Sequence, residues 1–271
     1  MPQTVALLGV PFDAESSFER GPALAPAAIR AALRRESSNT STEGGLDVAD
    51  PGVLIDAGDL DFTGLDGAAI RARIEAGVAE VLESGSTPLI LGGDHSITYP
   101  VLRAVARRFP NLNVLHFDAH PDLYDSFEGG RFSHACPFAR IMEEKLATRL
   151  VQVGIRTLSR PQREQADRFG VEIHEMRHWT GPISLSFEGP LYISLDIDVL
   201  DPAFAPGISH PEPGGLSVRD VLAVIQRVKA ERFVGADVVE LNPVNDPSPR
   251  TGLVAAKFVK ELTERLYPGA R

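Results

Sequence analysis

The sequence contains one cysteine in 271 residues, Cys136, so no disulfide can form within the chain. This excludes a disulfide-stabilised scaffold and favours a reducing compartment. No stretch reaches the roughly 18 apolar residues that a membrane-spanning helix requires. The first residues also lack the basic start and apolar run of a signal peptide. We therefore expect a cytoplasmic protein that has no membrane partner.

Positive charge is also scarce. The 27 Lys and Arg residues are outnumbered by 37 Asp and Glu residues, and the net charge is −10 at pH 7. Nucleic acid is not expected as a partner, because phosphate binding requires a basic surface. The hydrophobic fraction of 43% is that of an ordinary globular chain. Because no linker, internal repeat or low-complexity segment interrupts the sequence, we expect a single domain over residues 1–271.

Short apolar runs alternate with longer amphipathic stretches along the chain. The apolar runs predict strands at Thr4–Val10, Val53–Ala57, Thr87–Leu91, Asn113–Phe117, Leu150–Val153, Val171–His174, Leu191–Leu195 and Phe233–Val239. The amphipathic stretches predict helices at Pro22–Arg35, Gly67–Glu83, Ile97–Arg108, Pro137–Leu146, Arg160–Phe169, Ser217–Lys229 and Thr251–Leu266. This alternation indicates an α/β fold with a parallel sheet whose two faces are both covered.

Potential metal ligands gather in a few short segments. Asp118, His120 and Asp122 occupy alternate positions, and in an extended backbone residues two apart point the same way. We therefore expect these three side chains to converge. Asp196 and Asp198 form a second alternating pair, and a third segment ends in His95, so that the set contains four carboxylates and two imidazoles.

This set of ligands is about what a two-metal site requires. Oxygen ligands with a minority of imidazole favour Mn²⁺ or a similar cation, whereas structural zinc would recruit thiolates. The ligands also share a position, since His95, Asp118, Asp196 and Glu240 each follow a predicted strand. Parallel sheets bind ligands at that edge. The alternative is that these residues are turn formers and helix caps, but clustered buried carboxylates are costly without cations.

Three other polar residues have two interpretations each, and a fourth has one. His134 is either a proton shuttle at the mouth of the site or an ordinary surface histidine. Glu240 either binds a cationic substrate or is a solvated strand-end carboxylate. Asp94 either orients His95 or caps a tight strand-to-helix turn. His116 lies within an apolar strand and is interpreted as a core residue.

Five segments together resemble the ureohydrolases, the family of arginase, agmatinase and formimidoylglutamase. They are Gly-Gly-Asp-His-Ser (92–96), Asp-Ala-His-Pro-Asp (118–122), Ser-His-Ala (133–135), Asp-Ile-Asp-Val-Leu-Asp-Pro-Ala-Phe-Ala-Pro-Gly (196–207) and Val-Glu-Leu-Asn-Pro (239–243). The resemblance covers nearly the whole chain in order. Segments 15–22, 123–129 and 208–215 are most similar to plant-type arginases.

The resemblance implies a three-layer α/β/α fold with a parallel sheet of about eight strands. It also implies two Mn²⁺ ions per subunit, held by His95, Asp118, Asp122 and Asp196 and by His120, Asp118, Asp196 and Asp198. A hydroxide that bridges the metals and is oriented by Asp122 would attack a guanidinium carbon held by Glu240, while His134 shuttles protons. The implied reaction converts arginine to ornithine and urea, in a homotrimer or homohexamer.

Other functions stay open at this point. Agmatine or another guanidino or formimino compound is an alternative small substrate, because the chain lacks the Asn-rich loop with which animal arginases hold the amino-acid end. Residues 126–131 and the loop around His210 are the candidates to replace that loop. Two other classes are a single-zinc deacetylase, which would not need both His95 and Asp198, and a non-catalytic binding member of the family.

Overall fold

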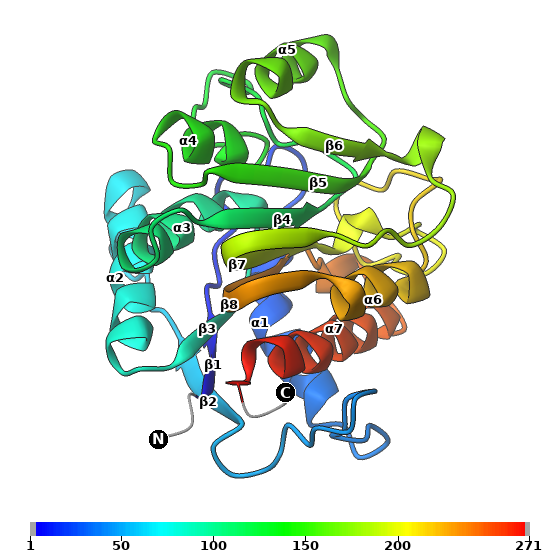
Figure 1. Cartoon of the computed structure of the whole chain (residues 1–271). Coiled ribbons are helices and arrows are strands. Elements are labelled where there is room, and N and C mark those ends of the chain that lie inside the picture. The colour runs from blue at the N-terminus through cyan, green and yellow to red at the C-terminus, as the bar shows by residue number, and fades with distance from the viewer. Residues whose placement is uncertain (1–3, 269–271) are drawn as a thin grey trace.

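The computed structural model describes residues 4–268, and within them the central feature is one sheet of eight strands. The strands are Val5–Gly9 (β1), Leu54–Asp59 (β2), Thr87–Leu91 (β3), Asn113–Phe117 (β4), Arg149–Ile155 (β5), Glu172–Glu175 (β6), Ser186–Asp196 (β7) and Lys229–Val239 (β8). They lie in the order β2-β1-β3-β8-β7-β4-β5-β6 (Figure 1), and every pair is parallel.

Helices cover both faces of this sheet. They are Ala25–Leu33 (α1), Gly67–Glu83 (α2), Thr98–Arg108 (α3), Pro137–Glu143 (α4), Arg160–Phe169 (α5), Val218–Arg227 (α6) and Arg250–Leu266 (α7). Short 3₁₀ helices lie at Pro22–Leu24 (η1), His95–Ile97 (η2), Met176–His178 (η3), Ile197–Val199 (η4) and Pro243–Asn245 (η5). None of the helices in residues 4–268 is long and apolar enough to cross a membrane.

Two apolar cores separate the three layers. Successive strand side chains point to opposite faces, so Leu89 and Leu91 join one core and Ile90 joins the other. The first core includes residues of α1, α6 and α7, and the second includes residues of α2, α3, α4 and α5 (Figure 1). The predicted three-layer α/β/α fold with about eight parallel strands is thereby confirmed.

Several predicted bounds are wrong, each for a local reason. β7 and β8 begin earlier than predicted because they pair with each other from Ser186 and Lys229 onward, where β8 is polar and exposed. The helix predicted to reach Lys229 consequently ends at Arg227. α4 ends at Glu143 rather than at residue 146, and the chain turns at Lys145, whose φ is 55°. β2 is an edge strand and largely exposed rather than covered on both faces.

Candidate active site

Four strands that are neighbours in the centre of the sheet carry the predicted ligands. β3, β8, β7 and β4 lie side by side, and the ligand segments follow or end them. His95 begins η2 after β3, Asp196 ends β7, Asp118 follows β4 and Glu240 follows β8. The expectation that these residues share the carboxyl edge of the sheet is confirmed.

The predicted reason for the convergence of Asp118, His120 and Asp122 is wrong. The chain bends after β4 instead of staying extended, and Asp122 has a φ of 51°. The side chains still approach a common point, because His95 Nδ1 lies 3.1 Å from Asp118 Oδ2 and 3.2 Å from Asp122 Oδ2. A backbone bend, rather than strand alternation, therefore brings Asp122 to the site.

The orientation of His95 leaves one ring nitrogen facing negative charge. Its Nε2 lies 2.9 Å from Ser194 Oγ, which in turn donates to Asp237 Oδ1 at 2.7 Å. Because the hydroxyl proton goes to Asp237, Ser194 accepts the proton of Nε2. A neutral ring would then direct the Nδ1 lone pair at three carboxylates, including Asp196 Oδ2 at 3.2 Å, and the buried Nδ1 has no hydrogen-bond partner.

Asp237 is the anchor of this arrangement, and the sequence did not reveal it. It is fully buried and also accepts hydrogen bonds from the hydroxyls of Tyr192 and Thr98, at 3.0 and 2.9 Å. The interpretation that Asp94 orients His95 is not supported. Asp94 instead accepts from the backbone N–H of Ser96 and caps η2, which is the alternative given above. The only sequence signal for Asp237 was a carboxylate inside an apolar run.

A second group of ligands lies beside the first. His120 Nδ1 is 2.9 Å from Asp198 Oδ2 and 3.4 Å from Asp118 Oδ1. The other oxygen of Asp198 accepts from the backbone N–H of Ala119 at 3.0 Å, which ties η4 to the segment after β4. The six predicted ligands therefore form two adjoining groups that share Asp118.

The electrostatics of these groups fit bound cations. Burial, with the nearby charges of Asp198 and Asp118, raises the pKa of Asp196 well above its ordinary value. Burial alone would lower the pKa of His95, but the three carboxylates beside Nδ1 outweigh this and raise that pKa well above its usual range. The donors are mostly carboxylate oxygens with two imidazoles, a set that suits Mn²⁺ or a similar divalent ion.

His116 is fully buried, as the core interpretation requires, but it has a polar role as well. Gln152 donates its Nε2 hydrogens to Pro121 O and, at 3.0 Å, to His116 Nδ1. The proton of His116 is thus on Nε2, which lies 2.8 Å from Asp118 Oδ2. His116 orients a predicted ligand, and this contact was not predicted.

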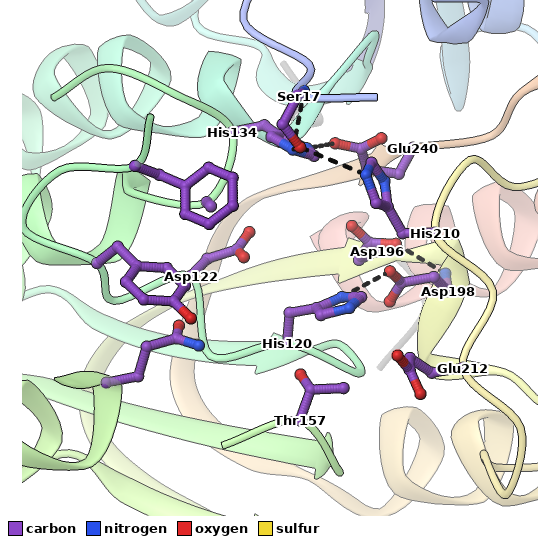
Figure 2. A pocket seen from close by; sticks show the side chains of 14 residues that line it. Ser17, His120, Asp122, His134, Thr157, Asp196, Asp198, His210, Glu212 and Glu240 are labelled. Atoms are coloured by element: carbon purple, nitrogen blue, oxygen red, sulfur yellow. Dashed lines mark hydrogen bonds and ion pairs between the residues drawn. The ribbon is translucent and has the colours of Figure 1, made fainter. Parts of the chain in front are cut away.

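His134 and Glu240 form a hydrogen-bonded pair at one side of the site, and Ser17 completes it (Figure 2). His134 Nδ1 lies 2.8 Å from Glu240 Oε1, and His134 Nε2 lies 2.9 Å from Ser17 Oγ and 3.2 Å from the Ser17 backbone N. The backbone N–H suits a neutral ring, and the hydroxyl oxygen can accept from a protonated one. Ser17 thus satisfies Nε2 in both protonation states, and no spacing in the sequence pointed to it.

Glu240 sets the charge state of its partner. Burial alone would lower the pKa of His134, but the charge and hydrogen bond of Glu240 outweigh it and raise that pKa to about 9. Glu240 Oε1 also accepts from the backbone N–H of His95 at 2.8 Å. The φ of Glu240 is 63°, a strained value for a non-glycine residue, and its N–H donates to Gly93 O at 2.9 Å. A Cβ at Gly93 would overlap the Phe12 carbonyl oxygen, so this close approach requires glycine.

A cavity of about 230 Å³ opens over both groups. Its lining includes metal-ligand candidates together with residues of the surrounding loops, namely Ser17, Tyr124, Phe127, Ala135, Thr157, Gln162, His210 and Glu212. Of the predicted segment 126–131 only Phe127 lines the cavity, whereas the loop around His210 does so as expected. The ring of His210 lies 4.9 Å from that of His134 between centroids, and burial lowers its pKa.

Comparison with known proteins gives a consistent assignment. Residues 3–264 match the Arginase family. The chain is 48% identical to arginase 1, mitochondrial, of Arabidopsis thaliana over 97% of this chain and 81% of that one. It is 37% identical to a mitochondrial agmatinase of Gallus gallus, over 95% of this chain and 79% of that protein. The solved structure of an arginase from Medicago truncatula has a TM-score of 0.91 at 45% identity, covering 97% of this chain and 87% of that chain.

The names of the two curated relatives include the word mitochondrial, so a cytoplasmic location of this chain stays a prediction. One of these relatives is named an arginase and the other an agmatinase, so proteins named for either activity are similar to this chain. With the eight-stranded parallel sheet and the motifs at its carboxyl edge, these matches show that the chain is a ureohydrolase enzyme that belongs to the Arginase family.

Proposed function

We propose that this enzyme hydrolyses arginine to ornithine and urea. The observation that carries the proposal is the orientation of His95, whose Nδ1 faces three buried carboxylates within 3.2 Å. A neutral ring in this position needs a cation beside Nδ1, and a pair of divalent cations is what a hydrolysis of this kind uses. The identity of 48% to a protein named arginase supports the choice of substrate.

Two Mn²⁺ ions would be held by the two groups described above. His95, Asp122, Asp118 and Asp196 would hold one, and His120, Asp198, Asp118 and Asp196 the other. Bound there, the cations would supply a water made nucleophilic near neutral pH and positive charge beside a developing oxyanion. Asp122 would accept a hydrogen bond from that water.

The protein's own residues would bind the substrate and move protons. Glu240 lines the cavity and is buried, so its carboxylate would pair with the guanidinium. His134 keeps its Nδ1 proton on Glu240, which leaves Nε2 as the nitrogen that exchanges a proton. With a pKa of about 9 the ring is protonated at neutral pH and can deliver that proton to the leaving amine.

Urea release from arginine in the presence of Mn²⁺ tests the proposal. We expect activity in the wild type and a loss of at least about 100-fold in His134→Ala, the range that general acid–base catalysis contributes. His178→Ala is the matched control, because it removes an exposed imidazole that does not line the cavity. Asp122→Asn should also lose activity together with bound Mn²⁺. One tightly bound zinc per chain and no urea would favour the deacetylase alternative and refute the proposal.

Agmatine is the second candidate substrate, and one observation favours it. Among the described residues that line the cavity there is no lysine or arginine, so no ammonium or guanidinium side chain faces the carboxylate of arginine. Agmatine lacks that carboxylate. The ratio of kcat/KM for arginine and agmatine, measured with Mn²⁺, Ni²⁺ and Co²⁺, decides between them.

We also propose a homotrimer or homohexamer, on the family resemblance alone. Light scattering coupled to size exclusion should give three or six times the chain mass of 29.2 kDa. A monomer of unchanged activity would contradict this assembly. Fractionation of the source cells tests the cytoplasmic location.

A further inference from the structure

We propose that Glu212 selects the substrates of this enzyme by binding the ammonium group at the end opposite to the guanidino group. The inference rests on the proposed function, because it concerns the same cavity. It applies to arginine and agmatine alike, since both carry an ammonium at the same distance along the chain from the guanidino group. It predicts that guanidino acids without an ammonium are rejected.

The position of Glu212 supports this role. It lines the cavity from the loop between η4 and α6. Figure 2 shows Glu212 and Thr157 on the side of the cavity away from Ser17, His134 and Glu240. A substrate whose guanidinium pairs with Glu240 would therefore extend its other end toward Glu212.

The loop that carries Glu212 is fixed rather than free. The guanidinium of Arg156 donates to the Glu212 carbonyl oxygen from Nε at 2.9 Å and from Nη2 at 2.7 Å. The same Nη2 lies 2.7 Å from the carbonyl oxygen of Asp198. The backbone of Glu212 is thus tied to the segment that carries a predicted metal ligand. A carboxylate held at a constant distance from the reacting centre can select substrates in which the ammonium and guanidino groups are separated by a matching length.

Of the carboxylates that line the cavity, one does not face a histidine of the site. Asp122, Asp196 and Asp198 face the two imidazole groups of the metal site, and Glu240 is bonded to His134. Glu212 is the remaining carboxylate among the lining residues that the structure describes. With no lysine or arginine in that lining, it attracts an ammonium and repels a carboxylate that brings no ammonium with it.

Glu212→Gln tests this assignment with arginine and two analogues, each of which lacks one of its charged groups. Arginine has both the ammonium and the carboxylate, agmatine has only the ammonium, and the deaminated analogue of arginine has only the carboxylate. We expect KM for arginine and agmatine to rise by about 10–100-fold with kcat nearly unchanged, because a charge-assisted hydrogen bond is lost far from the reacting carbon. For the deaminated analogue we expect KM to stay the same or fall. If the enzyme does not hydrolyse this analogue, the same is expected of its inhibition constant.

Two comparisons make the outcome decisive. Glu231→Gln removes an exposed carboxylate at the amino end of β8, away from the cavity, and should change none of the three constants. The anchor of Glu212 is its carbonyl oxygen, so the substitution keeps the loop in place, which unchanged thermal unfolding would verify. Equal changes on all three substrates, or no change, would overturn the role of Glu212. No urea from any substrate with the wild type would instead remove the proposed function.

Discussion

Replacing Ser194 with alanine tests whether a buried hydroxyl prepares His95 for a cation. Ser194 Oγ lies 2.9 Å from His95 Nε2 and 2.7 Å from Asp237 Oδ1. Without it the ring can turn, and Nδ1 is no longer fixed toward the carboxylates. Removal of such an outer partner weakens metal binding by about 10–100-fold, which corresponds to about 1.4–2.7 kcal/mol. We expect the Kd for Mn²⁺ to rise by that factor.

Tyr192→Phe provides the matched control for this substitution. Its hydroxyl donates to the other oxygen of Asp237 at 3.0 Å, but no hydrogen bond joins it to His95. Both variants remove one donor from the same fully buried carboxylate, so each should lower the free energy of unfolding by about 1–3 kcal/mol. Only Ser194→Ala should also weaken the binding of Mn²⁺.

Titration calorimetry of metal-free protein with Mn²⁺ gives the affinities, and unfolding in urea gives the stabilities. A weaker affinity in Ser194→Ala alone supports the orientation of His95 by Ser194. Equal affinities in the two variants would refute it, because the loss would then follow from a general weakening of the core.

Three further outcomes are expected. Hydrogen bonds from Arg219 and, to a lesser extent, Gln226 lower the pKa of Glu43 from 4.5 to about 2. The stability that this carboxylate contributes is therefore complete above pH 4.5 and is lost as the pH falls toward 2. The difference in unfolding free energy between the wild type and Glu43→Gln should shrink across that window, and a constant difference would contradict the prediction. Burial raises the pKa of the Cys136 thiol to about 12, so iodoacetamide at mildly alkaline pH should label it only after unfolding, as mass spectrometry would show. Gly93→Ala forces a Cβ against the Phe12 carbonyl and should cost about 1–3 kcal/mol in thermal unfolding; an unchanged melting temperature would show that the turn has room.

The sequence was enough to locate the eight strands and to place the predicted ligands at their carboxyl ends. Asn113–Phe117 and Thr87–Leu91 were predicted with the bounds observed, because each is a mostly apolar run that ends directly before a glycine or an aspartate. The amino ends of β7 and β8 were missed, because the pairing of Ser186 with Lys229 depends on a neighbour in space rather than on hydrophobic pattern.

The partners of the ligands could not be predicted for a different reason. Ser17 reaches His134 across 117 positions of the chain, and Ser194 reaches His95 across 99. A single hydroxyl within a strand or loop has no periodicity or spacing that identifies its partner. Such contacts follow only from the order of strands in the sheet, which places β7 and β3 on either side of β8.

The sheet holds the carboxylates of the site together against their own repulsion. Asp118, Asp196 and Asp198 are all buried, and their mutual charge contributes to the raised pKa values of Asp196 and Asp198. β4 and β7, at whose carboxyl ends they lie, are paired with neighbours on both sides and packed between two apolar cores. The carboxylates therefore cannot separate unless the centre of the sheet is disrupted, and cations are the means of relieving the repulsion. Glu240, at the end of β8, is bonded to the imidazole of His134 instead, so it does not need a metal cation to balance its charge.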